Sequence, residues 1–309
     1  SLETALGVKF DEEDGLTFFR STLVQTLFYG LFAAWVLRHE RGDTTVFDWQ
    51  KAAHDLHVPM VSGLFEQLTM PSKLKGLNIA EVLDWTTAAL NRVDQAAFFK
   101  KFESGRAVQY FYEPFLDAFD YVLRKKLGVW YTPEEIVRYQ VATVDRVLRD
   151  ELNVPDGLAD EGVVVLDPCC GTGAYLVEVL RVIGESLNAK HGEALTPTLL
   201  KRAATTRLFG FELLPAPYVV AHLQLGLELR HRGAALQDEE RAAVYLTNAL
   251  TGWEPTRPGS PKEQIEGFPE IAKERDAANR VKQSAPILVI LGNPPYDGFA
   301  GVTVDEERD

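Results

Sequence analysis

The sequence has no apolar run long enough to cross a membrane as a helix. A spanning helix needs about 20 consecutive apolar residues, and the longest run, Thr26–Leu37, is shorter. The chain also does not open with a charged segment and a small-residue cleavage site, which mark a secretory signal. We therefore expect Thr26–Leu37 to form a buried helix, and we expect no membrane partner.

Cysteine is scarce, because the chain has only Cys169 and Cys170. Adjacent cysteines rarely form an unstrained disulfide, and two thiols without nearby histidines make a poor metal site. We expect no disulfide and no metal, and this cysteine usage is typical of a reducing cytoplasm.

Positive charge is also in short supply, since the net charge is −13. Phosphate contacts need Lys and Arg, so this balance argues against tight DNA binding by this segment alone. The main DNA-binding surface is therefore expected elsewhere. Basic residues do cluster at three places, which are Lys73/Lys75, Lys100/Lys101/Arg106 and Arg124-Lys125-Lys126.

The composition is that of a globular protein, without fixed-period repeats or low-complexity segments. The first 150 residues have apolar side chains at helical spacing, in stretches 18–37, 79–90, 108–123 and 136–148. Thr132-Pro133-Glu134-Glu135 predicts a helix start, with Thr132 as N-cap and Glu135 completing a capping box.

The pattern changes near residue 160, where short apolar runs begin to alternate with helical stretches. Strands are predicted at 162–166, 208–211, 243–246 and 287–291, with helices at 174–187 and 219–229. A polar stretch, 252–283, is predicted to be a surface excursion with one charged helix. Such alternation indicates an α/β fold with a parallel sheet.

A Gly-rich turn, Asp167-Pro168-Cys169-Cys170-Gly171-Thr172-Gly173, follows the first predicted strand and precedes a helix. Glycines allow close backbone approach to a ligand, and the helix start offers free N–H groups. The turn matches neither the dinucleotide fingerprint nor the P-loop. The alternative interpretation is a turn without a ligand.

Two further segments follow predicted strands at the edge where open α/β sheets bind ligands. Glu212 ends the second strand, where an acid commonly accepts hydrogen bonds from ribose hydroxyls; the alternative is a solvated carboxylate.

Asn293-Pro294-Pro295-Tyr296 follows the fourth strand. Its prolines stiffen the backbone and leave the Asn293 amide oxygen and the Pro294 carbonyl as a pair of acceptors. Such a pair can hold the amino group of a base taken out of its helix, and Tyr296 can stack on that base; the alternative is a stiff loop.

These motifs, in this order, resemble those of DNA methyltransferases that modify exocyclic amino groups. Gly128–Glu134 resembles the Tyr-Thr-Pro motif of the adenine-specific gamma-order branch. Upstream segments resemble the large single-chain restriction–modification enzymes of the type ISP and type IIL/IIG groups, at Gln25–Ala34, Tyr112–Leu116 and Leu123–Lys126. The resemblance covers nearly the whole chain.

The resemblance implies a Rossmann-like class I methyltransferase sheet, incomplete in this chain, over residues 128–309, preceded by an α-helical domain over 1–127. The implied cofactor is S-adenosylmethionine, with S-adenosylhomocysteine as product. Asn293, Pro294, Pro295 and Tyr296 would hold the target base. The implied cofactor-binding residues are Tyr131, Thr132, Pro133, Asp167, Pro168, Cys169, Gly171, Gly173, Glu212, Leu213, Asn248 and Asn293.

The implied activity is methylation of N6 of a flipped adenine in double-stranded DNA, within a restriction–modification or phage-defence system. Asn at the head of the motif favours adenine over cytosine. Asn248 replaces a more usual Asp, which puts its role in question. We expect a further C-terminal part or a partner chain to carry target recognition. Two alternatives stay open: methylation of rRNA or of a protein glutamine, and a cofactor-binding fragment without catalysis of its own.

Overall fold

The computed structural model describes residues 12–52, 56, 79–102, 132–237, 240–254 and 269–294. The chain divides into two compact units, one of residues 12–126 and one of residues 127–309 together with 1–11. The helix expected at 108–123 lies outside the described residues. So do three of the candidate site residues, Tyr131, Pro295 and Tyr296.

The unit of residues 12–126 is helical in its described parts, with α2 (Glu12–Glu40), the short 3-10 helix η1 (Trp49–Lys51), α6 (Ala80–Asn91) and α7 (Gln95–Phe102). The run Thr26–Leu37 lies within α2, and most of its side chains are buried. The predicted buried helix is therefore confirmed. No helix in the described ranges has the length and hydropathy to cross a bilayer.

Aromatic packing and side-chain hydrogen bonds join the elements of this unit. The Trp35 ring on α2 lies 5.1 Å from Phe98 and 5.0 Å from Phe99 on α7, centroid to centroid. The Trp49 indole N–H of η1 donates to Asp84 Oδ1 on α6 at 2.6 Å. The helices thus bury their apolar faces against one another, as a helical bundle requires.

The second unit alternates helices and strands. Its described elements are α10 (Glu134–Asp150), the 3-10 helix η3 (Gly157–Ala159), β1 (Val165–Asp167), α11 (Ala174–His191), α12 (Thr196–Thr206), β2 (Leu208–Glu212), α13 (Pro215–His231), β3 (Val244–Leu246), α14 (Pro269–Ser284) and β4 (Val289–Ile290). All strand pairs are parallel, in the order β3-β2-β1-β4. The mixed α/β fold expected from the alternation is confirmed.

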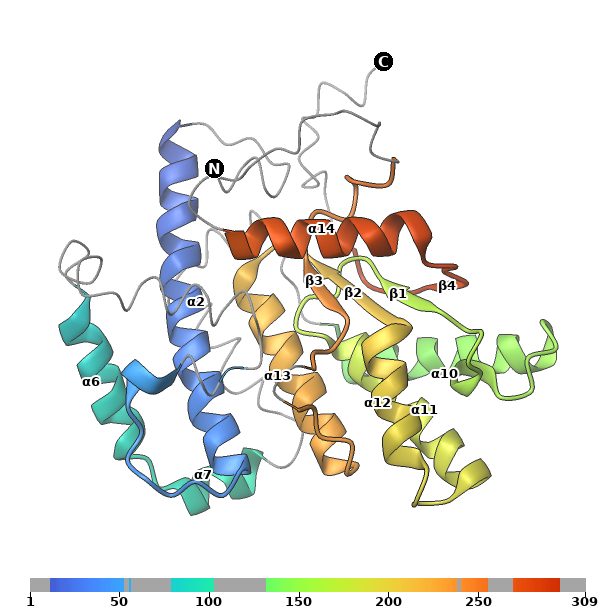
Figure 1. Cartoon of the computed structure of the whole chain (residues 1–309), viewed down its shortest axis with the longest axis horizontal. Helices are drawn as coiled ribbons and strands as arrows, with labels where there is room; N and C mark the ends of the chain where they lie inside the picture. The colour runs from blue at the N-terminus through green and yellow to red at the C-terminus, as the bar shows by residue number, and fades with distance from the viewer. Residues whose placement is uncertain are drawn as a thin grey trace. The chain divides into compact units, whose positions relative to one another are not determined.

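The sheet is covered on both faces (Figure 1), with α14 on one side of the strands and α11, α12 and α13 on the other. Under α14, the core contains Leu166, Phe209 and Phe211 from the strands and Ala278 and Val281 from the helix. Burial on both faces explains why the strands are continuous apolar runs rather than alternating ones.

The strands differ from the predicted ranges mainly at their starts. Val163 and Val164 are buried but precede β1. The Val163 N–H donates to the Asp160 carbonyl at 3.1 Å, in a local turn. At β4, Leu288 and Ile290 are exposed while Val289 is buried. The charged helix expected within 252–283 is confirmed as α14, whereas α7 and α12 were not predicted.

The predicted capping box at the start of α10 is wrong. The helix begins at Glu134, Pro133 is the N-cap, and no side chain caps the helix. The Thr132 hydroxyl is instead engaged by a residue that follows β4, as described below. A local motif was overridden here by a long-range contact, which sequence spacing cannot reveal.

Candidate functional site

The chain order of the strands marks one edge of the sheet as the place for a ligand. From β1 the chain moves outward to β2 and β3 and then returns to the other side of β1 with β4. β1 is therefore the point where the strand order reverses, and ligands of open parallel sheets bind at such a switch point, beyond the carboxyl ends of the strands. The Gly-rich turn, Glu212 and Asn293 all follow strands at this edge.

The Gly-rich turn is held in shape by two backbone–backbone hydrogen bonds and one hydrogen bond from a side chain. Cys170 N–H donates to the Phe211 carbonyl at 2.9 Å, and Gly173 N–H donates to the Cys170 carbonyl at 2.7 Å. From α13, the Gln224 amide donates to the Thr172 carbonyl at 2.5 Å. The turn is therefore positioned before any ligand arrives.

Two glycines give the turn its conformation, each for a different reason. Gly171 has a φ of +54° and Gly173 has a φ of +89°, in the left-handed region that β-carbons disfavour. A β-carbon on Gly173 would lie 3.2 Å from Ala221 of α13, so this glycine allows α11 and α13 to pack closely. A β-carbon on Gly171 would meet no atom of the described residues within 4 Å, so these residues leave open space above Gly171.

Glu212 is bound to the turn. Its carboxylate accepts hydrogen bonds from Gly171 N–H at 2.9 Å and from Leu214 N–H at 2.7 Å. Burial raises the pKa of Glu212 to about 7, and these N–H donors oppose that rise. The half-buried Glu212 carboxylate is therefore held by backbone N–H groups as well as being partly open to solvent.

Asp167 is a fully buried carboxylate at the end of β1. Its Oδ1 accepts from Cys169 N–H at 3.1 Å, whereas its Oδ2 is buried without a partner among the described residues. Burial, and to a lesser extent the nearby Glu212, raise the pKa of Asp167 to about 8. A buried oxygen without a donor is costly, so Asp167 is suited to a ligand that brings a donor or a positive charge.

The two cysteines of the turn are free thiols. Burial raises the pKa of Cys169 to about 12, and it raises the pKa of Cys170 as well. Thiols with raised pKa values are poor nucleophiles and poor metal ligands at neutral pH. Both cysteines therefore shape the turn without a chemical role of their own.

Two segments distant in sequence meet at the carboxyl end of β4. The Asn293 side-chain amide Nδ2 donates to Thr132 Oγ1 at 3.0 Å, across 161 positions of the chain. No described donor contacts the Asn293 Oδ1, so the amide oxygen stays available as an acceptor. The neighbouring Gly292 passes Asp167 so closely that a β-carbon there would lie 2.4 Å from Oδ1.

Among the other candidates, Pro133 and Pro294 are exposed, while Pro168 and Leu213 are half-buried at the same edge. Asn248 is half-buried after β3, and its Oδ1 accepts from Leu250 N–H at 2.9 Å in a local turn. The amide oxygen of Asn248 is thus engaged within its own loop.

The structure also shows residues near the candidate site whose contacts the sequence patterns did not predict. Gln224 is a polar residue in an otherwise apolar stretch of α13, which is a usable signal. Gly292 immediately precedes the Asn-Pro-Pro motif, but only its contact with Asp167 explains it. Lys282 lies among many charged residues of α14, so nothing in its sequence context marks it as buried.

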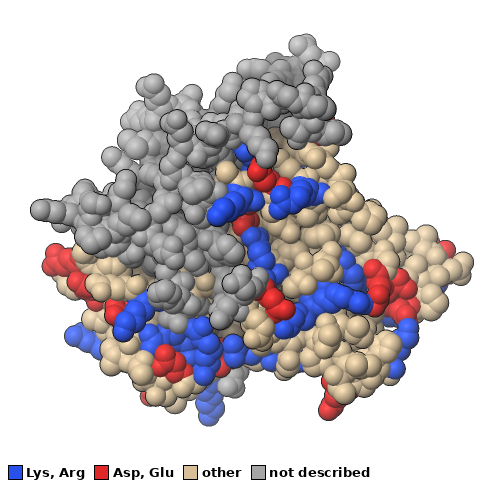
Figure 2. Space-filling model, viewed as in Figure 1, with Lys and Arg blue, Asp and Glu red and all other residues tan. Residues whose placement is uncertain are grey.

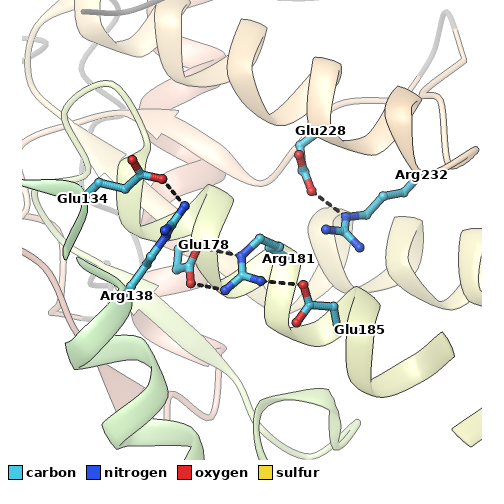
Figure 3. Close-up of polar contacts among 7 residues, drawn as sticks. All are labelled: Glu134, Arg138, Glu178, Arg181, Glu185, Glu228 and Arg232. Atoms are coloured by element: carbon cyan, nitrogen blue, oxygen red, sulfur yellow. Dashed lines mark hydrogen bonds and ion pairs between the residues drawn. The ribbon is translucent and has the colours of Figure 1, made fainter. Parts of the chain in front are cut away.

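Charge on the described surface is mixed rather than uniformly basic. Figure 2 shows Lys and Arg side chains with Asp and Glu side chains beside them. Arg138 on α10, Arg181 on α11 and the C-cap of α13, Arg232, pair with carboxylates of these helices (Figure 3). The contacts are Glu134–Arg138, Glu178–Arg181–Glu185 and Glu228–Arg232. Of the basic clusters noted in the sequence, the structure describes only the Lys100 side chain.

The comparisons with known proteins agree with this geometry. Residues 105–250 match the model of the N-6 DNA Methylase family. The N-6 DNA Methylase match contains β1, the Gly-rich turn, β2 and β3, and it ends before β4. No curated protein matches the chain.

Solved structures with a similar fold include a DrdV–DNA complex and two type ISP restriction–modification enzymes. The chain of the DrdV–DNA complex has a TM-score of 0.60 and 23% identity, over 90% of this chain and 24% of that one. A nuclease-deletion mutant of the type ISP restriction–modification enzyme LlaGI, in complex with a DNA substrate mimic, has a TM-score of 0.62 and 19% identity, over 96% and 21%. The ATP-dependent type ISP enzyme LlaBIII, bound to DNA, has a TM-score of 0.61 and 20% identity, over 96% and 18%.

This chain therefore shares its fold with part of these proteins and spans less than a quarter of their length.

Proposed function

We propose that this chain binds S-adenosylmethionine and methylates N6 of adenine in double-stranded DNA, as part of a restriction–modification or phage-defence system. The observation that carries the proposal is the hydrogen bond between Asn293 and Thr132. It joins the segment expected to hold the target base to the segment expected to close over the cofactor. The N-6 DNA Methylase match and the DNA-bound structural relatives support the same reaction and partner.

The residues at the sheet edge suit the cofactor. S-Adenosylmethionine supplies a methyl group on a positively charged sulfonium. Asp167 offers a buried carboxylate oxygen to which no described residue donates, and the described residues leave room for a ligand above Gly171, against the turn. Both features favour a cationic molecule at this place. The strand order β3-β2-β1-β4 also matches the start of the Rossmann-like order.

Within this assignment, Asp167, Pro168, Cys169, Gly171 and Gly173 form the wall for the methionine part. Glu212 accepts hydrogen bonds from the ribose hydroxyls, with Leu213 beside it. Because Glu212 already accepts two backbone N–H bonds, its orientation is set before binding. The remaining expected cofactor contacts come from Tyr131, Thr132, Pro133 and Asn248.

Asn293 and Pro294 act on the target base. The contact with Thr132 turns the Asn293 Nδ2 away and leaves Oδ1, together with the Pro294 carbonyl, to accept the two hydrogens of the adenine amino group. That arrangement withdraws the amino lone pair from the ring and directs it at the methyl group. The amino nitrogen would gain the methyl carbon as its bond to the sulfonium sulfur breaks and S-adenosylhomocysteine leaves. The amino nitrogen would then lose a proton to solvent, so no early base is needed. The contribution is one of positioning and electrostatics, with Pro295 stiffening the segment and Tyr296 stacking on the flipped base.

The proposal predicts N6-methyladenine in treated DNA. Plasmid DNA at high concentration is incubated with the full chain and S-adenosylmethionine, digested to nucleosides and analysed by mass spectrometry. Asn293→Ala should lower the rate by about a hundredfold or more, because one of the two acceptors is lost. Its affinity for S-adenosylhomocysteine should change little.

Asn188→Ala, which alters an exposed asparagine on α11, is the matched control and should keep the wild-type rate. Methyl transfer to cytosine, RNA or protein instead of adenine would contradict the assignment of the substrate. Equal rates for Asn293→Ala and Asn188→Ala would contradict the assignment of the site.

A further inference from the structure

Lys282 on α14 is a buried cation with an unusual set of partners. Its side chain is about 5% exposed. Its ammonium donates to Thr247 Oγ1 at 2.8 Å, to the Asn248 carbonyl at 2.7 Å and to the Thr251 carbonyl at 2.8 Å. It also lies 5.0 Å from the centre of the Phe211 ring. All three donors are therefore used on neutral oxygens.

The three acceptors belong to one loop. We call residues 247–254, which follow β3, the β3 loop. Burying an ammonium without a carboxylate costs free energy, and no described carboxylate pairs with Lys282. The hydrogen bonds and the Phe211 face offset that cost only while the loop keeps this shape. Lys282 thus couples the position of α14 to the conformation of the loop.

A second residue of α14 holds the same loop. Gln283 donates to the Gly252 carbonyl at 3.1 Å and to the Glu254 carbonyl at 2.8 Å. Within the loop, the Trp253 indole N–H donates to the Ala249 carbonyl at 2.6 Å. The loop is therefore a rigid element with its own internal contacts, anchored on α14.

The β3 loop borders the residue to which we assign the ribose hydroxyls. Leu246, at the end of β3, pairs with Glu212 in the sheet, and Thr247 N–H donates to the Glu212 carbonyl at 2.8 Å. A shift of the loop would therefore move one wall beside Glu212. Because the Asn248 Oδ1 accepts from Leu250 N–H within the loop, the conformation of the loop also sets where the Asn248 side chain lies.

We propose that Lys282 is a positioning residue for the nucleoside half of the cofactor, acting through the β3 loop that it holds against β2. This inference rests on the proposed function, because it takes the Glu212 edge as the place where ribose and adenine bind. Lys282 touches neither reacting atoms nor the methionine part. Its loss should therefore affect the binding of nucleosides and leave the chemical step largely intact.

The test compares ligand binding by calorimetry in full-length variants. Lys282→Met keeps the length of the side chain but removes the charge and the donors. We expect its Kd for S-adenosylhomocysteine and for 5′-methylthioadenosine, which lacks the amino-acid part, to rise by about tenfold each. At saturating cofactor, kcat should stay within about threefold of wild type. Lys273→Met, at an exposed lysine of the same helix, should match wild type in both.

A second variant keeps the test decisive if Lys282→Met does not fold. Thr247→Val removes one acceptor and should weaken both nucleoside ligands in the same direction, by a smaller factor. In a folded double variant the two effects should not add, because they remove one shared interaction. If Lys282→Met folds and binds both ligands with wild-type affinity, the inference on Lys282 is overturned but the proposed function is not. If Lys282→Met does not fold, unchanged affinities in Thr247→Val have the same consequence. A wild-type chain that binds neither ligand would overturn the proposed function as well.

Discussion

At the scale of single residues, the buried carboxylates define the candidate site. Asp167 and Glu212 both have pKa values well above the ordinary range, because burial penalises their charged forms. Most buried polar groups are satisfied, so the Oδ2 of Asp167, which has no partner within the described part of the chain, needs an explanation. A cationic ligand would explain it, because its positive charge would offset the cost of burying this carboxylate oxygen.

Asp167 predicts a specific pH dependence of stability. Its pKa rises from the ordinary 3.8 to about 8 in the folded state, so the folded chain holds this proton more tightly than the unfolded chain. The ligand-free protein therefore loses stability through Asp167 as the pH rises from about 4 to about 8. Asp167→Asn removes that loss. We expect its Tm to exceed that of wild type by several degrees near pH 8, with a smaller difference near pH 5.

Asp156→Asn is the matched control, because the Asp156 carboxylate lies at the surface beside Lys190, a contact that lowers its pKa. That variant should show no gain in Tm as the pH rises. Thermal unfolding at several pH values gives the comparison. A Tm difference for Asp167→Asn that shrinks toward pH 8 would contradict the assignment of a raised pKa.

At the scale of elements, the start of α10 shows how tertiary contacts reassign a local motif. Thr132-Pro133-Glu134-Glu135 has every residue of a capping box, yet Pro133 is the N-cap and the Thr132 hydroxyl accepts from Asn293. Proline already fixes the backbone angle that a helix start needs, so α10 can begin without a side-chain cap. The hydroxyl is then available to orient the Asn293 amide.

Thr132→Val tests which role matters. Valine keeps the shape and removes the hydroxyl, so the Asn293 amide loses the contact that orients it. We expect kcat for DNA methylation to fall by about tenfold, with Tm within about 2 °C of wild type. Thr132→Ser should restore most of the rate. A large fall in Tm with an unchanged kcat would support the capping role instead.

At the scale of the whole molecule, the net negative charge disfavours strong DNA binding by this chain alone. The net charge is −13. The three arginines drawn in Figure 3 each pair with a nearby glutamate. The solved relatives are much longer than this chain, and they are DNA complexes. We propose that a further part of the protein or a partner chain supplies most phosphate contacts and recognises the target.

This proposal predicts weak and sequence-independent binding of duplex DNA. By fluorescence anisotropy at physiological salt, we expect a Kd no tighter than about 10⁻⁵ M. Few phosphates would be neutralised, so affinity should fall only gently as salt increases. Submicromolar binding with a steep salt dependence would show that this chain carries its own DNA-binding surface.

The sequence by itself determined the alternation of strands and helices, since β-branched apolar runs and helical periodicity are local signals. It also placed the Gly-rich turn, Glu212 and Asn293 after strands, and the parallel sheet brings these to one edge. The predicted starts of the strands were less accurate, as at Val163, because a residue can be buried while its N–H bonds back to a local turn, at the Asp160 carbonyl, and not to a neighbouring strand.

Only the tertiary structure decided which groups meet. The Thr132–Asn293 bond spans 161 positions, the close pass of Gly292 at Asp167 joins two strands, and Lys282 gains its partners from a loop of another connection. Sequence periodicity shows whether a side chain faces a core, but it cannot show which distant backbone that side chain will meet. The order of the strands in the sheet fixes those encounters, and with them the geometry of the site.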